Sequence, residues 1–511
     1  MIKRDGNRVS LWQANIAPYE SRNTINNNRY FDIAVIGGGI TGITTALLLQ
    51  EAGKNCVVLE AASLCFGTTG GTTAHINTLL DTPYTTISKN FGDENAKLVA
   101  QATNAAINLI KENISRYKID CAFKDASAYL FAQDEKQAEE LGRIRSATSQ
   151  AGIAVHSAGN IPVPISFKQA IQVPGQAKFN PVQYVYALAE AFENAGGVIV
   201  QHCRVNGINE NETADIETTQ GNFRAERVVY ATHIPPGVNL IHLRCAPYRS
   251  YAMAVKLNND TYPENLCYDM YDPYHYYRTQ MVDNEPYFIA GGYDHKTGHE
   301  ENTQKCLMEL EAHVRRYFDI KKIAYQWSSQ YFESADGLPY IGKLPGHTDL
   351  VYVATGFGGN GMTYSQVSAL VLKSILLNQD SPYISLFDPN RLKPVAGFKN
   401  FITHNAEVAK DFLGKYFSRE KLHELAELAP GEGKVVTYES EKIALHKDEN
   451  GEIHAISPTC THLKCSVAWN NAEQSWDCPC HGARYSHDGE VLTGPATADL
   501  EKINMEELVE K

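Results

Sequence analysis

The clearest hydrophobic pattern in the chain lies in residues 31–60. A short apolar run, Ile33 to Ile36, suits a strand buried on both faces, and a glycine-rich turn leads from it into a longer apolar stretch. A second short run, Cys56 to Leu59, follows. The pattern predicts a strand, a tight turn, a helix and a second strand. A membrane helix over Ile33 to Leu49 is the alternative, but adjacent glycines and several threonines interrupt that stretch and argue against it.

The turn after the first strand carries glycines in G-x-G-x-x-G spacing. Gly37 permits the tight turn, Gly39 lets backbone N–H groups approach phosphate oxygens, and Gly42 lets the helix lie close to the sheet. The helix N-terminus then faces the anion. Glu60 ends the second strand near the distance expected for a carboxylate that accepts ribose hydroxyls. These features predict a dinucleotide site for NAD or FAD.

Two more glycine-rich segments favour FAD. Residues 67–76, GTTGGTTAHI, form a Gly/Thr-rich loop whose hydroxyl and amide groups could wrap the pyrophosphate of a permanently held cofactor. Far downstream, the apolar run Leu350 to Ala354 precedes another glycine-rich turn and a helix from about Thr363. Both ends of this part of the chain therefore return to one sheet.

With these three segments the sequence resembles the D-amino-acid oxidase-like flavoprotein family, which includes glycine oxidase and sarcosine oxidase, from about Phe31 to Leu377. The resemblance implies an α/β FAD-binding domain with an antiparallel substrate sheet over the flavin. It places the late glycine turn against the flavin and Val205 at the adenine end, although a plain core valine fits the strand pattern equally well. The residues expected to bind FAD are Gly37, Gly39, Ile40, Thr41, Gly42, Glu60, Thr68, Thr69, Gly71, Thr72, Val205, Gly358, Gly359, Asn360, Gly361 and Met362.

Alternating, aromatic-rich segments from Pro247 to Tyr293 match the expected substrate sheet. Arg278 stands on one of these strands beside Tyr276 and Tyr277, and a guanidinium in an aromatic pocket can hold a substrate carboxylate through two hydrogen bonds. Family members that oxidise amino acids hold them in that way. The alternative is an arginine that is solvated or ion-paired. We therefore expect these three residues to bind the substrate, whereas residues 85–200, with apolar spacing of three and four, are predicted to be helical.

A second motif lies near the C-terminus. Cys460 and His462 form C-x-H, and fifteen residues later Cys478 and His481 form C-x-x-H. This is the ligand set of a Rieske [2Fe–2S] cluster, in which two thiolates hold one iron and two imidazoles hold the other. A zinc site is the alternative, but zinc sites rarely combine this spacing with two spare cysteines.

Residues from about Gly433 to Ile503 resemble a Rieske domain of the cytochrome bc type. The resemblance implies a disulfide between Cys465 and Cys480, and it matches Tyr485 to a residue that hydrogen-bonds a ligand sulfur. Ala483 stands where a serine is usual, and the loss of that donor is expected to lower the cluster potential.

Composition sets the outer limits. The 511 residues, 43% of them hydrophobic and 21% charged, suit a globular protein of two or three domains. A formal charge of −13 argues against nucleic acid or an anionic membrane as partner. No transmembrane segment is expected, and the first thirty residues lack the apolar core of a secretory signal peptide, so we expect a cytoplasmic protein. The expected divisions are an N-terminal segment (1–30), an oxidoreductase domain (31–380), a connector with an amphipathic helix over Ala406 to Phe417 (381–430) and a Rieske domain (431–511).

Together the two motifs resemble bacterial D-amino-acid oxidase-like flavoproteins that carry a C-terminal Rieske domain. The implied function is a dehydrogenase that oxidises the C–N bond of a small amine or amino acid and passes electrons singly through the cluster to a one-electron acceptor, a protein or a quinone. Two alternatives remain open. One is a reductase that takes electrons inward from NAD(P)H, and the other is a non-enzymatic redox sensor. The two halves are expected to have separate cores.

Overall fold

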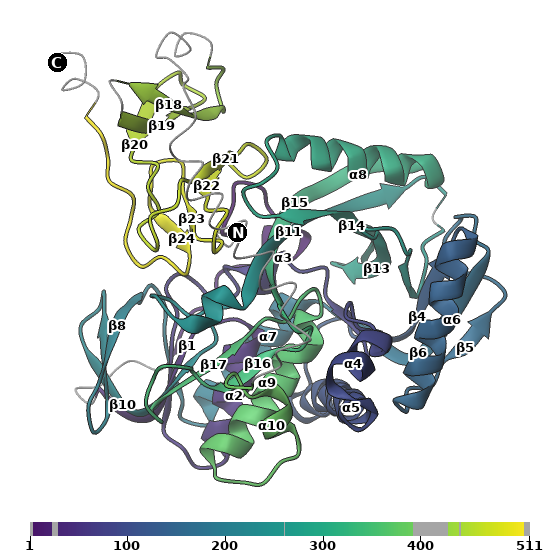
Figure 1. Ribbon diagram of the computed structural model, residues 1–511, viewed down its shortest axis with the longest axis horizontal. Coiled ribbons are helices and arrows are strands. Elements are labelled where there is room, and N and C mark those ends of the chain that lie inside the picture. Colours follow the sequence, from purple (N-terminus) through teal and green to yellow (C-terminus); the bar gives the residue numbers. More distant parts are fainter. Residues whose placement is uncertain (1–3, 23–28, 260, 392–427, 439–440, 505–511) are drawn as a thin grey trace.

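The computed structural model of the protein describes residues 4–22, 29–259, 261–391, 428–438 and 441–504 (Figure 1). An α/β layer, a second sheet with its covering helices, and a small β domain make up these residues (Figure 1). The predicted connector helix over Ala406 to Phe417 lies outside the described residues. Within them, no helix combines the length and the apolar character that a membrane span requires.

The α/β layer is organised around β1 (Tyr30–Ile36), which is the first strand of the predicted strand–turn–helix–strand unit. Its neighbours on both sides run parallel to it, and apolar side chains fill both faces of the sheet. The strand order across the described part is β16-β17-β10-β1-β2-β7. The bounds are β2 (Cys56–Leu59), β7 (Val198–Val200), β10 (Phe223–Tyr230), β16 (Tyr340–Lys343) and β17 (Val351–Thr355), with β8 (Val205–Glu210) and β9 (Ala214–Thr218) extending from β10.

Helices cover this sheet where the apolar pattern predicts them. The core beneath them is made mainly of Val, Ile, Leu and Ala side chains, joined by several aromatic ones, from the strands and from the inner faces of the helices. Helix α2 begins directly after the first glycine turn, and α9 begins directly after the late one, so both N-termini point toward the same edge of the sheet. The bounds are α2 (Ile40–Glu51), α5 (Asp93–Tyr117), α7 (Pro181–Asn194) and α9 (Gly361–Leu376).

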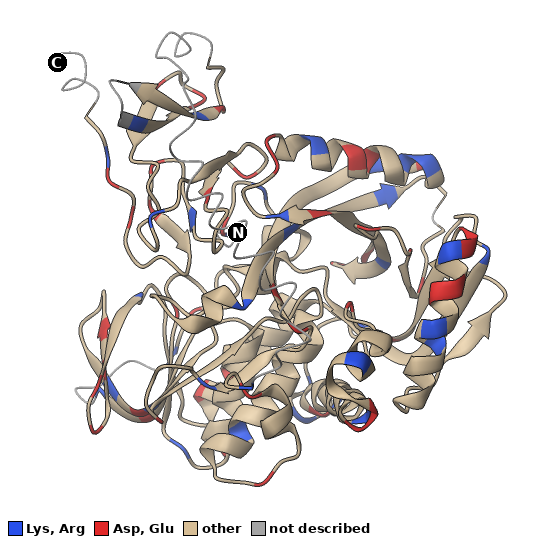
Figure 2. Cartoon of the chain, in the orientation of Figure 1, with Lys and Arg blue, Asp and Glu red and all other residues tan. Residues whose placement is uncertain are grey.

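The second sheet is mostly antiparallel, as the resemblance implied, and its order among described residues is β15-β11-β14-β13-β12-β4-β6-β3. Helix α8 (Thr303–Tyr317) lies over it, and both α8 and α6 (Glu135–Gln150) carry acidic as well as basic residues (Figure 2). The bounds are β3 (His75–Ile76), β11 (Cys245–Leu257), β12 (Leu266–Tyr268), β13 (Tyr276–Val282), β14 (Glu285–Lys296) and β15 (Ile320–Ser334).

The prediction that residues 85–200 are helical is wrong for part of that stretch. α4 (Tyr84–Phe91), α5 and α6 are helices, but β4 (Lys124–Ala132) and β6 (Gln169–Lys178) pair with each other and extend the second sheet through β12; β5 (His156–Ala158) pairs with β6. Pairing with distant strands buries Phe131 and Val173 completely. Tertiary pairing decides such segments, because their local propensity is weak.

The C-terminal described residues form a small β domain with its own core around Trp476 and Tyr485. Two of its strands, β19 and β20, pair antiparallel on either side of the Asn450–Gly451 turn. One sheet contains β18 (Gly433–Tyr438), β19 (Glu441–Lys447) and β20 (Ile453–Ile456), and the other contains β21 (Ala468–Asn470), β22 (Ser475–Asp477), β23 (Arg484–Tyr485) and β24 (Val491–Thr493).

Two segments outside the expected oxidoreductase domain also pack on it. Helix α10 (Tyr383–Phe387) buries Phe387 completely in the core of the α/β layer. At the other end, α1 (Leu11–Ala14) buries Leu11, and the Trp12 ring nitrogen donates to the Thr72 carbonyl oxygen at 2.6 Å. The N-terminal segment therefore holds the Gly/Thr-rich loop in place.

Candidate active site and cluster site

A long pocket lies between the two sheets, and the predicted dinucleotide residues meet in it. Fifteen of the sixteen residues expected to bind FAD line its wall, and Gly42 does not. A Cβ atom on Gly42 would lie 1.9 Å from the Gly37 carbonyl oxygen, so this glycine is required where α2 approaches the turn. Bare backbone at the turns leaves room for a pyrophosphate next to the start of α2. The wall thus fits an elongated dinucleotide.

Glu60 lines this pocket at the end of β2. Its carboxylate accepts hydrogen bonds from the backbone nitrogens of Gly38 at 2.6 Å and Ala62 at 2.8 Å. Burial raises the pKa of Glu60, although these amide donors oppose that rise. The side chain is therefore fixed beside the glycine turn, where a ribose would lie.

The two glycine-rich loops are tied together across the pocket. Ile40 N donates to Thr69 Oγ1 at 3.1 Å, which joins the Gly/Thr loop to the start of α2. The late turn is held by Asp81, whose carboxylate accepts from Gly359 N at 2.8 Å and whose backbone nitrogen donates to Asn360 Oδ1 at 2.9 Å. Asp81 belongs to no sequence motif that could have identified it.

The structure places Arg278 outside the pocket lining, away from where a substrate ligand was expected. Its side chain is fully buried, it is not among the described residues that line the pocket, and its guanidinium donates to the carbonyl oxygens of Thr73, Ala74 and Phe179. Burial lowers its pKa to about 9. Arg278 anchors the backbone of the Gly/Thr loop and of Phe179, and both of its terminal nitrogens donate to these carbonyl oxygens.

The two neighbouring tyrosines separate because successive side chains on a strand point to opposite faces. Tyr276 faces the pocket, and its hydroxyl lies 2.8 Å from Ser250 Oγ. Tyr277 faces the other side of the sheet, is fully buried and bonds to His313. Of the three substrate candidates, only Tyr276 lines the pocket.

One end of the pocket is lined by Ser250, Tyr276 and Tyr331 of the second sheet, and we call it the sheet end. A carboxylate that no sequence motif indicated, Asp294, stands there. Asp294 accepts hydrogen bonds from Tyr331 OH at 2.9 Å and from Ser250 Oγ. Burial raises its pKa to about 7, with the nearby charge of Asp81 adding to the effect. Among the described pocket-lining residues the one Lys or Arg is Arg204, which lies beside Val205 at the Glu60 end. The sheet end is thus acidic and rich in tyrosine.

His75 also lines this end of the pocket. Its Nδ1 lies 2.6 Å from Tyr268 OH, and its ring packs edge-on against Tyr268 and Tyr276. Burial lowers its pKa well below the usual value, so the ring is neutral. A neutral imidazole in this position orients the surrounding hydroxyl groups.

The four predicted cluster ligands come together at one end of the small β domain. The rings of His462 and His481 lie 5.1 Å apart, and hydrogen bonds from Cys478 and Tyr485 lower the pKa of the Cys460 thiol to about 6. His462 Nε2 donates to the Gly237 carbonyl oxygen at 3.1 Å, while its buried Nδ1 has no hydrogen-bond partner among the described residues. An orphaned Nδ1 and a ready thiolate fit a [2Fe–2S] cluster.

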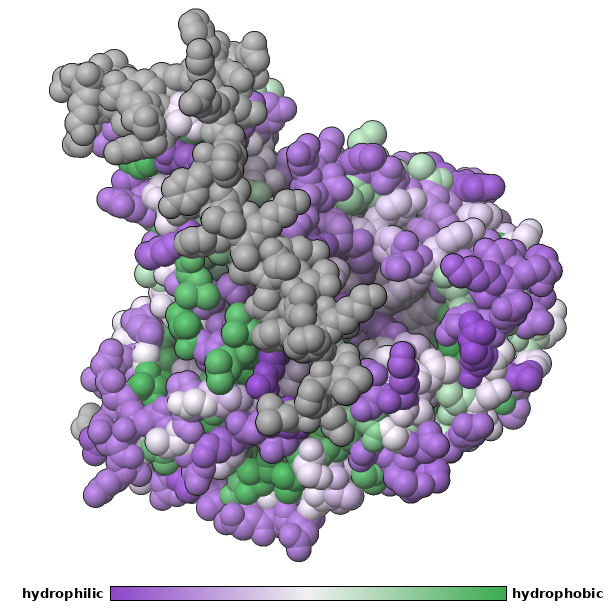
Figure 3. Space-filling model, viewed as in Figure 1, coloured by the Kyte–Doolittle hydropathy of each residue, from purple (hydrophilic) through white to green (hydrophobic). Residues whose placement is uncertain are grey.

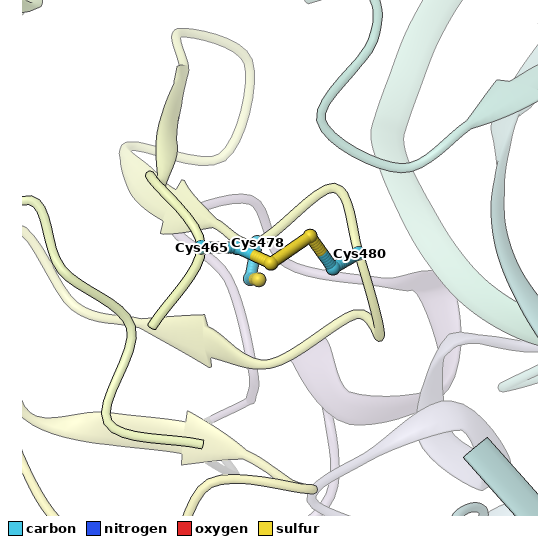
Figure 4. A group of neighbouring side chains, drawn as sticks. All are labelled: Cys465, Cys478 and Cys480. Carbon is cyan, nitrogen blue, oxygen red and sulfur yellow. A yellow bond between two sulfur atoms is a disulfide. The ribbon is translucent and has the colours of Figure 1, made fainter. Parts of the chain in front are cut away.

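Two further cysteines and a tyrosine hydroxyl lie around the ligands. Cys465 and Cys480 are joined as a disulfide beside the Cys478 sulfur (Figure 4). Tyr485 OH lies 3.2 Å from Cys460 Sγ, in keeping with the hydrogen bond expected there. Ala483 is fully buried and offers no hydroxyl.

The histidine edge of the cluster site faces the oxidoreductase domain. His242 lies on the short helix η1 (Leu240–Leu243). The centre of its ring is 4.6 Å from the centre of the His462 ring and 5.8 Å from that of the His481 ring. Gln330, which lines the pocket, donates from Nε2 to the Gly482 carbonyl oxygen at 2.8 Å. The Gln330 side chain therefore links the pocket wall to Gly482, which follows the cluster ligand His481.

A buried charge network joins the small domain to the rest. Glu473 accepts from Arg4 at 3.2 Å and from Ser328 N at 2.7 Å, and Arg484 pairs with both Asp5 and Asp477 at 3.0 Å. Burial opposes ionisation, but the charges of Arg484 and Arg249 outweigh it and lower the pKa of Asp477 to about 2. The small domain has its own core around Trp476, but its Ala472 packs in the core of the second sheet, and the domains share a buried polar interface.

Comparison with known proteins agrees with both sites. Residues 32–374 match the family model described as FAD dependent oxidoreductase, and residues 419–504 match the Rieske [2Fe-2S] domain. The Rieske 2Fe-2S iron-sulfur protein YhfW of Bacillus subtilis is 33% identical over 478 residues, which cover 93% of this chain and 94% of that protein. Gamma-glutamylputrescine oxidoreductase of Escherichia coli is 22% identical and covers 72% of this chain and 88% of its own length.

The fold has solved counterparts. The crystal structure of glycine oxidase from Geobacillus kaustophilus superposes with a TM-score of 0.61 at 18% identity, covering 71% of this chain and all of that one. L-proline dehydrogenase from P. horikoshii gives 0.58 at 19% identity, covering 71% of this chain and 98% of that one. At these identities the likeness shows only the fold, which is that of the α/β layer and the second sheet.

Proposed function

The chain belongs to the FAD dependent oxidoreductase family and carries a Rieske [2Fe–2S] domain, and from that premise we propose that it is an amine dehydrogenase. It removes two electrons and two protons from a C–N bond, leaving an imine that water hydrolyses. The two electrons then leave one at a time through the cluster to an external one-electron acceptor. FAD supplies two-electron chemistry when bound, and the cluster supplies one-electron steps.

The observation that carries this proposal is the contact between the pocket and the cluster loop. Gln330 lines the pocket, is almost fully buried, and hydrogen-bonds the Gly482 carbonyl oxygen. Packing of His242 against both histidine ligands adds a second contact between the domains. Because electron transfer requires close approach of the two groups, these contacts support transfer between a flavin in the pocket and the cluster.

The pocket favours an amine over an amino acid as substrate. Arg278 is committed to backbone carbonyl oxygens, so the sheet end offers no guanidinium among the described lining residues for a substrate carboxylate. Asp81 and Asp294 line that end instead, and carboxylates attract an ammonium group. With a pKa near 7, Asp294 can also hold the proton that an ammonium group must release before oxidation of the neutral amine.

Hydrophobic side chains are exposed beside the histidine edge of the cluster site. Val238 is 67% exposed and Leu240 is 51% exposed next to His242, and Leu463 is 36% exposed next to His462. Figure 3 shows hydrophobic residues gathered in this region, below the small β domain. An apolar rim of this kind suits contact with an external acceptor, a protein or a quinone. We further propose that the Cys465–Cys480 disulfide forms in the native protein and clamps the two ligand loops, and that the protein acts in the cytoplasm.

The test is an anaerobic screen of amines and amino acids for bleaching of the flavin absorbance. Cationic amines should bleach it, and electrons should then appear in the cluster, seen by its EPR signal. Bleaching by NADH but by no amine would favour the inward-running reductase instead. Failure of every amine, amino acid and nicotinamide to bleach the flavin would favour a redox sensor.

A further inference from the structure

Part of the wall of the FAD pocket comes from the Rieske domain. Strand β24 and the residues after it line the same pocket as Glu60 and Val205, which mark its adenosine end. These residues form and follow the last strand of the cluster-bearing sheet, more than a hundred positions away from the late glycine turn. The lining residues from the Rieske domain are Val491, Leu492, Thr493, Gly494, Ala496 and Thr497.

Hydrogen bonds fix this wall segment, residues 491–497, against the oxidoreductase domain. Arg204, also a pocket residue, donates from Nη2 to the Val491 carbonyl oxygen at 2.7 Å. At the other end of the segment, Gly237 N donates to the Pro495 carbonyl oxygen at 3.0 Å. Both contacts therefore use carbonyl oxygens of the wall segment. Their donors are Arg204, which lines the pocket, and Gly237, which follows the pocket residue Pro236. The wall segment is thus held in register with the pocket rather than lying loosely over it.

We propose that the Rieske domain is a structural part of the FAD-binding site, and that the wall segment covers the adenosine half of the cofactor. Leu492, half-buried at the pocket wall, supplies apolar surface for that half. Each of the two processes, FAD binding and docking of the Rieske domain, then stabilises the other by the same free energy. The inference goes beyond the proposed function, because it holds for any substrate and for either direction of electron flow.

The first experiment measures FAD affinity in the full-length protein after the flavin is removed and restored. Leu492→Ala should raise the FAD dissociation constant by about tenfold, the factor that corresponds to about 1.4 kcal/mol. Ile453→Ala is the matched control, because Ile453 is also a half-buried aliphatic residue of the Rieske domain but does not line the pocket. The visible circular dichroism of the cluster should be the same in both variants. Equal FAD affinities in the two variants would overturn the proposal.

A second measurement needs no substitution. Hydrogen–deuterium exchange of the wild-type protein, with the cluster in place, should show slower exchange of amides in residues 491–497 when FAD is bound than when it has been removed. Amides of β20 should exchange at the same rate in both states, because that strand lies in the other sheet of the domain. If FAD leaves exchange in residues 491–497 unchanged, the wall segment does not contact the cofactor.

Discussion

Replacing Asp294 with asparagine removes a negative charge from the sheet end of the pocket and keeps the shape of the side chain. In the wild-type protein the carboxylate accepts from Tyr331 OH at 2.9 Å and from Ser250 Oγ. Asparagine retains one acceptor oxygen, and the hydroxyl that faces its new NH₂ group can rotate to accept. The variant should therefore fold normally while losing the charge that attracts an ammonium group.

The expected loss follows from the kind of bond removed. A hydrogen bond to a charged group contributes about 1.5–3 kcal/mol, so the dissociation constant of a cationic amine should rise by roughly 10- to 150-fold. Asp294 has a pKa of about 7, so its carboxylate is ionised above that pH and protonated below it. Amine binding to the wild-type protein should accordingly weaken as the pH falls through 7. The variant should lack this pH dependence.

The assay is an anaerobic titration of flavin bleaching with one amine, repeated from below to above pH 7. Asp283→Asn is the control. It makes the same chemical change at an exposed residue, in the turn between β13 and β14, that does not line the pocket. The control should bind and titrate as the wild type does. If Asp294→Asn binds the amine as tightly as the control at high pH, the ammonium is held elsewhere and the substrate assignment fails.

Four further outcomes test other parts of the structure. Gln330→Leu removes the bond to Gly482, so stopped-flow oxidation of reduced flavin by the cluster should slow while the cluster EPR signal persists; an unchanged rate would place the electron path elsewhere. His462→Ala should abolish bound iron and labile sulfide and sharply lower turnover with a one-electron acceptor, yet substrate should still bleach the flavin. Glu60→Ala leaves two backbone amides without their acceptor, so FAD should be lost more readily on dialysis. Arg278→Lys should lower the melting temperature and leave amine affinity unchanged, since the lost contacts are to backbone carbonyl oxygens; weaker amine binding would restore it as a ligand.

Residues whose function depends on short-range spacing could be predicted from the sequence. The glycine turn at Gly37, the carboxylate at Glu60 and the ligand set that begins at Cys460 each serve a geometry set by a few neighbouring residues. The residue types and their spacing along the chain are enough to recognise such motifs. The fold class followed from these motifs and from the resemblance they supported.

Other residues could not be found that way. Arg278 stood beside two tyrosines, a pattern that suits a ligand and a structural anchor equally, and only the positions of Thr73 and Ala74 decided between them. Asp81 and Asp294 carry no motif, because each is an isolated acidic residue that becomes part of a site through pairing of distant strands. β4 and β6 were missed for the same reason, since their neighbours in the sheet are far away in sequence.

The sequence by itself determined that this chain has a dinucleotide site and a two-histidine, two-cysteine cluster site, because both are written in short motifs whose spacing fixes their chemistry. Only the tertiary structure decided how the two sites meet: that Gln330 and His242 contact the cluster loops, and that Leu492 lines the FAD pocket. The physical reason is that contacts between domains depend on the summed fit of many surfaces and buried charges, to which no local stretch of sequence corresponds.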